Sequence, residues 1–226
     1  HAVTADVHVD DASDSEPSGE WLDATRALPA GHPVWPGDAP FVVVPTARIP
    51  EGSPVNLSST SATTHLGTHV DAPWHYDDEA PRIESIGLDV LIGEGQVVDV
   101  SDAEGPIEAD ELPEGPYAGR VLLRTGQPDA WTSFPAALRP LTPDAIRRLA
   151  AGGARLIGTD APSVDALDSK DLPAHHACGA SGVTIVEGLA LGGVPPGRCR
   201  VMCLPIRLVG TDAAPARVVV QPLRDA

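Results

Sequence analysis

"HLGTHVDAPWH" (residues 65–75) places three of the chain's eight histidines and one aspartate within eleven residues. A helix is excluded over this stretch, because Gly67 and Pro73 would both lie inside it. An extended backbone instead separates the side chains by parity. One face would carry the polar His65, His69, Asp71 and His75, and the other the apolar Leu66, Val70, Ala72 and Trp74. The stretch therefore predicts a strand-based fold in which an extended segment presents a polar site and packs its other face on a core.

The spacing of the first two histidines requires this segment to bend. A flat strand places residues four positions apart about 13 Å from each other, whereas a metal ion lies only about 2.1 Å from each ligand atom. His65 and His69 can therefore share an ion only if the chain bends between them. Gly67 is the residue that permits such a bend, because it has no side chain.

Outward from this stretch, the sequence is typical of a strand-rich protein. Short β-branched segments bounded by Gly, Pro or Asp predict strands at 41–49, 90–100, 120–125, 154–160, 183–191, 199–209 and 216–223. One helix is strongly indicated, over 141–154, with Thr142 as its N-cap, Pro143 in its first turn and Gly152 near its end. The predicted fold class is α/β, a strand-rich single domain at residues 21–226.

The first twenty residues have a different composition from the rest. They carry six acidic residues, no Lys or Arg, and almost no large apolar side chains. Such a segment cannot bury enough surface to offset the entropy lost on ordering. We predict a flexible acidic tail at residues 1–20, ahead of the domain.

Charge and cysteine usage limit the classes of partner and the compartment. A net charge of −17 repels nucleic acid and anionic membrane surfaces, and no apolar run approaches the ~20 residues of a membrane span. We therefore expect no nucleic acid and no membrane as partners, and a small molecule as substrate. The three cysteines follow no paired framework, and no signal peptide is recognisable. These features predict a cytoplasmic protein with reduced thiols.

A second group of ligand-type residues occurs in "LPAHHACGASGVTIVEGL" (172–189). Here His175, His176 and Glu187 lie close to apolar strand sequence. Neutral imidazole and carboxylate ligands suit Zn²⁺ or Mn²⁺, and Asp and Glu can each bridge two ions. The alternative is that these histidines are hydrogen-bonded in turns. The pattern H-x3-H-x-D-x3-H together with a distant H-x11-E favours the metal site.

The complete motif H-x-G-T-H-x-D-x-P-x-H at 65–75 resembles the signature of the metal-dependent cyclase superfamily. Within it, the chain is most similar to the kynurenine formamidase family, through segments 33–41, 52–59, 158–165, 169–176 and 186–191. The similarity extends from about Trp21 to Leu223. It implies a swivelling β/β/α domain that forms homodimers. Residues 23–25 read Asp-Ala-Thr where the family often has Asp-Ile-Ser or Asp-Ile-Thr, which weakens a core contact without touching the site.

The resemblance also implies a metal-ligand set. Its five members are His65, His69, Asp71, His175 and Glu187. Asp71 and Glu187 would bridge two zinc ions per subunit, with manganese as the other candidate metal. The family's spacing to Glu187 favours His175 over its neighbour His176 as the ligand.

Two further residues receive roles from the resemblance. His75 corresponds to the acid/base catalyst, although its position alone also allows a third ligand to one ion. Trp35 corresponds to an aromatic residue that contacts the substrate, although it could equally be a loop tryptophan packed on its own domain.

The implied reaction is hydrolysis of N-formyl-L-kynurenine to L-kynurenine and formate. An amide resists water at neutral pH, and zinc lowers the pKa of water and stabilises a developing oxyanion. His75 would take a proton from the water and return it to the departing nitrogen. The alternatives are a related hydrolase, such as one that opens isatin, and a dimeric metal-binding protein whose site has lost its activity. A histidine at 75 beyond the ligand set argues against the second alternative.

Overall fold

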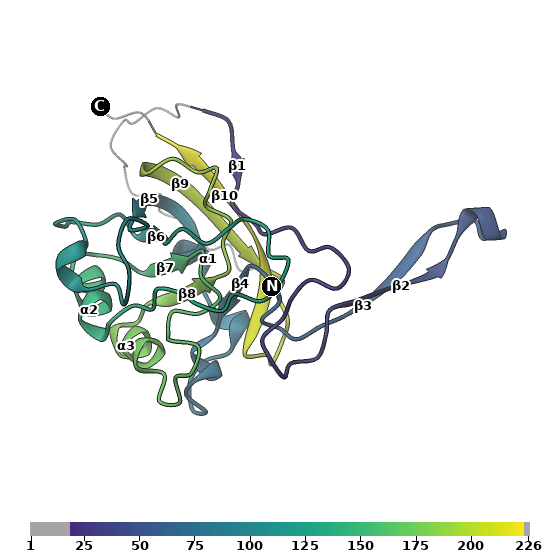
Figure 1. Cartoon of the computed structure of the whole chain (residues 1–226), viewed down its shortest axis with the longest axis horizontal. Coiled ribbons are helices and arrows are strands. Elements are labelled where there is room, and N and C mark those ends of the chain that lie inside the picture. The colour runs from purple at the N-terminus through teal and green to yellow at the C-terminus, as the bar shows by residue number, and fades with distance from the viewer. Residues whose placement is uncertain (1–18, 224–226) are drawn as a thin grey trace, which may run out of the picture.

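The computed structural model describes residues 19–223, so most of the predicted tail lies outside the described residues. One sheet dominates, and its strands are Leu22–Asp23 (β1), His69–Asp71 (β4), Ile92–Asp99 (β5), Arg120–Arg124 (β6), Leu156–Thr159 (β7), Thr184–Glu187 (β8), Gly197–Pro205 (β9) and Ala213–Pro222 (β10). Their order is β1-β10-β4-β8-β7-β6-β5-β9, and a further pairing of β9 with β10 closes the sheet into a barrel (Figure 1). The predicted strand-rich α/β class is confirmed.

The apolar residues of the central strands alternate between two cores. β6, β7 and β8 run parallel to one another and are buried on both faces. Leu122, Leu156 and Val186 lie inside the barrel, in a cluster to which every barrel strand contributes. Their neighbours on the opposite face, Val121, Leu123, Ile157 and Ile185, belong to a second cluster with the helices Pro143–Ala151 (α2) and Pro173–Ser181 (α3). The strand period of two therefore supports two cores from one set of strands.

Helices are short and lie mostly on one side of the barrel (Figure 1). The predicted helix at 141–154 is confirmed as α2, and the Thr142 side chain accepts a hydrogen bond from the Ala145 backbone N–H, as an N-cap should. The remaining α-helix is Leu88–Leu91 (α1), and the 3₁₀ turns are Ile49–Glu51, Pro73–His75, Ile83–Ser85 and Ala109–Glu111. Within residues 19–223, no helix combines the length and apolar character needed to cross a membrane.

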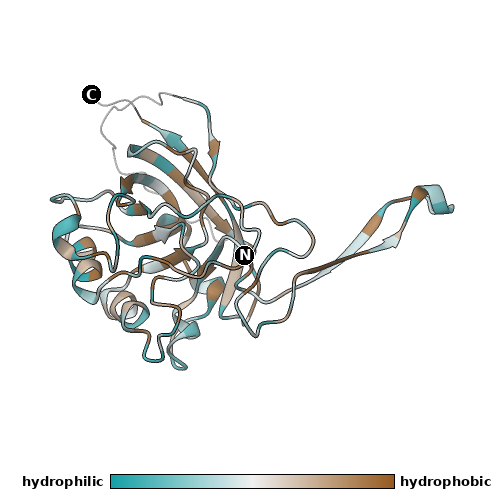
Figure 2. Cartoon of the chain, in the orientation of Figure 1, coloured by the Kyte–Doolittle hydropathy of each residue, from teal (hydrophilic) through white to brown (hydrophobic). Residues whose placement is uncertain are grey.

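A hairpin projects away from the barrel (Figure 1). It consists of Val42–Ala47 (β2) and Leu57–Ser61 (β3), which pair antiparallel with each other and with no other strand of the described chain. Apolar side chains along it are between 41% and 56% exposed, namely Val42, Val44, Ile49, Val55 and Leu57. Figure 2 shows brown, hydrophobic segments along the projecting ribbon. These side chains give the hairpin a partly exposed apolar surface. A two-stranded ribbon is only marginally stable alone in water, so a contact that covers this surface would stabilise it.

Candidate metal centre and catalytic site

The register of β4 brings the two sequence clusters together. β4 lies between β8 and β10 and pairs antiparallel with both. His69 is directly opposite Glu187, although the two residues are far apart in the sequence. Opposite residues on antiparallel strands have Cβ atoms only about 5 Å apart, so this pairing fixes one edge of the site.

The chain bends immediately before β4, as the spacing of the histidines predicts. Gly67 adopts φ of +58°, in the left-handed region that favours glycine. The imidazole rings of His65 and His69 consequently lie with centroids 4.8 Å apart. Both side chains therefore reach the same carboxylate, that of Asp71.

Three histidines each direct one ring nitrogen toward the buried Asp71 carboxylate, and two of these nitrogens also face Glu187. His65 Nδ1 lies 3.1 Å and His69 Nε2 3.3 Å from Asp71 Oδ1. His175 Nε2 lies 3.4 Å from the other oxygen, Asp71 Oδ2. Glu187 is shared in the same way, with Oε2 3.4 Å from His69 Nε2 and Oε1 3.6 Å from His175 Nε2. The five residues thus converge on one centre.

The second ring nitrogen of each histidine has its own acceptor. His65 Nε2 lies 2.9 Å from Asp212 Oδ2, and His69 Nδ1 donates to the Gly67 carbonyl at 3.0 Å. His175 Nδ1 lies 2.7 Å from Asp165 Oδ2. Metal-ligating histidines usually donate their other N–H to a carboxylate or carbonyl, which fixes both the tautomer and the ring orientation. All three rings are therefore held with one nitrogen free to face the centre.

The residues of this centre fit a divalent cation. Asp71, Glu187, His69 and His175 are between 2% and 4% exposed. Both Asp71 carboxylate oxygens and His69 Nε2 are buried without a hydrogen-bond partner among the described residues. Buried polar atoms normally have partners, and a bound cation would satisfy these three. Imidazole and carboxylate are the ligand types that Zn²⁺ and Mn²⁺ accept.

The electrostatics of the centre also require positive charge. Burial by itself lowers the histidine pKa values, but the neighbouring carboxylates outweigh it, raising the pKa of His65 to about 9 and those of His69 and His175 to about 10. Burial alone would raise the pKa of Asp71, yet the surrounding histidines hold it well below its usual value. The Asp71 carboxylate thus remains ionised and stabilises either imidazolium or a metal ion.

His75 lies beside this centre, and one of its ring nitrogens comes within 4.8 Å of ligand atoms of Asp71 and His175. It ends the 3₁₀ turn Pro73–His75, and its ring centroid is 4.2 Å from that of His65 and 5.7 Å from that of His175. Burial lowers the pKa of His75 below its usual value, so its imidazole is neutral at pH 7. His75 Nδ1 lies 3.6 Å from Asp212 Oδ2.

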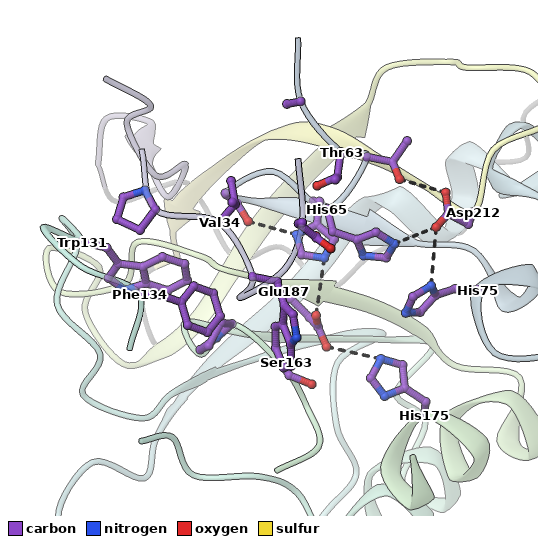
Figure 3. A pocket seen from close by; sticks show the side chains of 18 of the residues that line it. Val34, Thr63, His65, His75, Trp131, Phe134, Ser163, His175, Glu187 and Asp212 are labelled. Atoms are coloured by element: carbon purple, nitrogen blue, oxygen red, sulfur yellow. Dashed lines mark hydrogen bonds and ion pairs between the residues drawn. The ribbon is translucent and has the colours of Figure 1, made fainter. Parts of the chain in front are cut away.

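The centre opens into a cavity of about 660 Å³, a volume suited to a small organic molecule. Figure 3 shows Glu187, His175, His75 and Asp212 on one side of it and Trp131 and Phe134 on the other. The aromatic side consists of Trp35, Phe134 and Trp131, with ring centroids 5.3 Å apart for Trp35 and Phe134 and 6.0 Å apart for Trp131 and Phe134. We call these three residues the aromatic wall.

The aromatic wall is anchored by a buried guanidinium. Arg26 is 1% exposed and lies 3.7 Å from the centroid of the Trp131 ring. It donates to the carbonyl oxygens of Pro128, Gly188 and Leu189. One side chain therefore links the loop that carries Trp131 to the chain segment that follows Glu187.

The structure separates the two adjacent histidines of α3. Successive residues of a helix point about 100° apart, so His175 faces the centre whereas His176 is exposed and lies outside the cavity. Trp35 and His75 both line the cavity, as do all the predicted ligands except Asp71, which lies beneath it. The sequence reasoning missed Asp165, Asp212, Trp131 and Phe134.

Comparison with known proteins assigns the chain to a family. The Cyclase family model matches residues 22–166. The chain belongs to the cyclase family. Among curated cyclase-family relatives, the kynurenine formamidase of Salinibacter ruber is 44% identical over 91% of this chain and 97% of its own length. That of Geobacillus thermodenitrificans is 38% identical over 90% and 98%.

Solved structures show the same family fold. A predicted metal-dependent hydrolase from Bacillus stearothermophilus is 30% identical, with a TM-score of 0.74 over 89% of this chain and 98% of its own. Isatin hydrolase A from Labrenzia aggregata has a TM-score of 0.76 over 91% of this chain and 94% of its own, at 22% identity, and shares the fold.

Proposed function

We propose that this protein is a metal-dependent arylformamidase that hydrolyses N-formyl-L-kynurenine to L-kynurenine and formate. One observation carries the proposal: a metal-type centre and an aromatic wall face each other across a single cavity. An aryl formamide has an aromatic ring next to the amide that must be cleaved, so it needs both surfaces at once. The kynurenine formamidases that this chain resembles over most of its length support the choice of substrate.

The proposed cofactor is two Zn²⁺ ions per subunit, with Mn²⁺ as the alternative. The support is that both carboxylates divide their oxygens between two groups of ligands. His65 and His69 face Asp71 Oδ1, whereas His175 faces Asp71 Oδ2. The Glu187 carboxylate likewise has one oxygen near His69 and the other near His175, as expected of a bridging carboxylate. Divalent ions in such a centre supply Lewis acidity, which polarises a carbonyl and makes water a stronger nucleophile near neutral pH.

The residues around the centre would carry out the proton transfers and the positioning. His75 is neutral at pH 7 and would accept a proton as water attacks the formyl carbon. It would return this proton to the aryl nitrogen as the C–N bond breaks, which turns the leaving group into a neutral amine. Trp35 and Phe134, two residues of the aromatic wall, would contact the aryl ring of the substrate.

The test is a direct comparison of two substrates. Zinc-loaded protein is offered N-formyl-L-kynurenine and isatin side by side. We expect N-formyl-L-kynurenine to be hydrolysed with kcat/KM in the usual enzyme range of ~10⁴–10⁸ M⁻¹s⁻¹. Turnover of isatin without turnover of N-formyl-L-kynurenine would instead identify a cyclic-amide hydrolase. No turnover of either, with metal bound, would support a metal-binding protein without activity.

We also propose that the protein is a cytoplasmic homodimer in which the hairpin β2–β3 contacts the second copy. The exposed apolar side chains of that hairpin support the dimer, and the three free, buried cysteines support a reducing compartment. Val44→Asp should convert the dimer to a monomer in light scattering, because it places a charge on the hairpin surface. Val44→Thr keeps the side-chain shape and should remain dimeric. A wild-type protein that is monomeric at high concentration would refute the proposal.

A further inference from the structure

Asp212 lies beside the C-terminal end of β4, the strand that carries His69 and Asp71. It immediately precedes β10, which pairs with β4 so that Ala213 is opposite Asp71. The Asp212 carbonyl accepts a hydrogen bond of 2.8 Å from the Ala72 backbone N–H. Because His65 and His75 flank β4 on either side, this pairing places the Asp212 carboxylate between their rings, as Figure 3 shows.

The carboxylate contacts three side chains of the motif region. Oδ1 accepts a hydrogen bond of 2.8 Å from the Thr64 hydroxyl, which fixes the rotation of the carboxylate. Oδ2 lies 2.9 Å from His65 Nε2 and 3.6 Å from His75 Nδ1. Among residues 19–223, the Asp212 carboxylate is the one that lies within 4 Å of a His75 ring nitrogen. One oxygen therefore faces both a candidate metal ligand and the candidate acid/base.

We propose that Asp212 is a positioning residue that orients the His65 and His75 rings together. This inference rests on the proposed function of the site. An acceptor at His65 Nε2 keeps the proton on that nitrogen and leaves Nδ1, which faces Asp71, to bind metal. The same oxygen draws His75 Nδ1 toward it and leaves Nε2 as the nitrogen available to the substrate. Asp165 fixes the ring of the candidate ligand His175 in the same way. Among the described carboxylates, only Asp212 contacts both a candidate ligand histidine and His75.

The first test compares Asp212→Asn with a matched control. Asparagine keeps the shape of the side chain but removes its charge. We expect kcat to fall about 10–100-fold, the usual effect of losing such a partner, with KM changed less than about threefold because the aromatic wall is untouched. Asp99→Asn should keep wild-type kcat, because Asp99 pairs with Arg124 outside this cavity although its side chain is similarly exposed, at 28% against 33%.

A second measurement does not depend on turnover. Competition with a chelator should show zinc affinity reduced about 10–100-fold in Asp212→Asn and unchanged in Asp99→Asn. Thr64→Val, which frees Oδ1, should shift zinc affinity in the same direction by a smaller factor. If wild-type protein fails to hydrolyse N-formyl-L-kynurenine, the proposed function fails, whereas the affinity comparison still tests Asp212.

A double-mutant cycle tests the link to His75. In a His75→Asn background, Asp212→Asn should reduce kcat by less than about threefold further, because its effect on catalysis is exerted through the ring that is already missing. Its effect on zinc affinity should persist. Wild-type kcat and zinc affinity in Asp212→Asn would overturn the proposal, and so would a full additional loss of kcat in the double variant.

Discussion

Replacing Gly188 with alanine tests how closely the two sides of the metal centre approach each other. Gly188 follows Glu187 and has φ of +67°. A Cβ atom there would lie 2.2 Å from the carbonyl oxygen of Gly67, much closer than any real contact allows. That oxygen is the acceptor for His69 Nδ1, so moving it also disturbs the orientation of the His69 ring.

The expected loss of stability has two parts. An alanine in the left-handed region costs about 1–2 kcal/mol. Forcing a methyl group against tightly packed backbone costs about 1–3 kcal/mol more. Gly182 provides the control, because its φ is +66° but a Cβ there meets nothing within 4 Å. Gly182→Ala should therefore lose only the first part, and Gly188→Ala the sum of about 2–5 kcal/mol.

Denaturant unfolding of both variants measures this difference, and chelator competition measures zinc affinity on the same samples. We expect Gly188→Ala to be the less stable variant and to bind zinc more weakly than wild type. Gly182→Ala should bind zinc normally, because it lies at the end of α3 away from the ligand contacts. Equal unfolding free energies for the two variants, within about 0.5 kcal/mol, would refute the steric argument.

The other predictions concern single histidines. His75→Asn should keep its metal content and lose about 10²–10⁴-fold in kcat, the usual effect of removing a proton-transfer group, and loss of metal with recovery in excess zinc would instead identify a ligand. His175→Ala should abolish activity while His176→Ala retains at least half, since only His175 faces the centre, and the reverse result would contradict the assignment. Burial, followed by the charge of Arg26, lowers the pKa of His32 below 6.5, so its folded form binds fewer protons than its unfolded form. The stability that neutral His32 contributes above pH 6.5 is therefore lost as the pH falls. From about pH 7 to about pH 5.5, the unfolding free energy of His32→Phe should fall less than that of wild type.

The sequence predicted best what depends on neighbouring residues. The motif at 65–75 has a parity and a glycine that together specify an extended, bent segment. β4 and the positive φ of Gly67 agree with it, whereas Pro73–His75 forms a 3₁₀ turn and is not extended. Every predicted strand overlaps a strand of the structure. The α2 helix was recognisable because its N-cap, Thr142, is adjacent to it.

α3 could not be predicted because its N-terminal cap is not local. Leu172 occupies the N-cap position with φ of 43° and supplies no side-chain hydrogen bond. The Asp165 carboxylate instead accepts hydrogen bonds from the backbone N–H groups of Ala174 and His175. A helix capped from several residues away leaves no N-cap pattern in the sequence.

The missed site residues have a similar explanation. Asp212 contacts His65 across a separation of 147 residues, through a strand pairing that no local pattern reveals. Phe134 and Trp131 belong to an irregular loop, and their position depends on Arg26, which lies far away in the sequence. The scarcity of aromatic residues was the one signal available, because four Trp and two Phe make each one in a loop noteworthy.

Because the pKa values of His65, His69 and His175 are raised, a metal ion that binds must displace protons from these rings. Without metal at pH 7, protons on these rings compensate the charge of Asp71, so this carboxylate can be buried before any ion arrives. Each proton displaced on loading makes the apparent metal affinity about tenfold stronger per unit of rising pH. The chain can therefore complete its fold first and acquire its ions afterwards, and acidification reverses the exchange by returning protons to the same nitrogens.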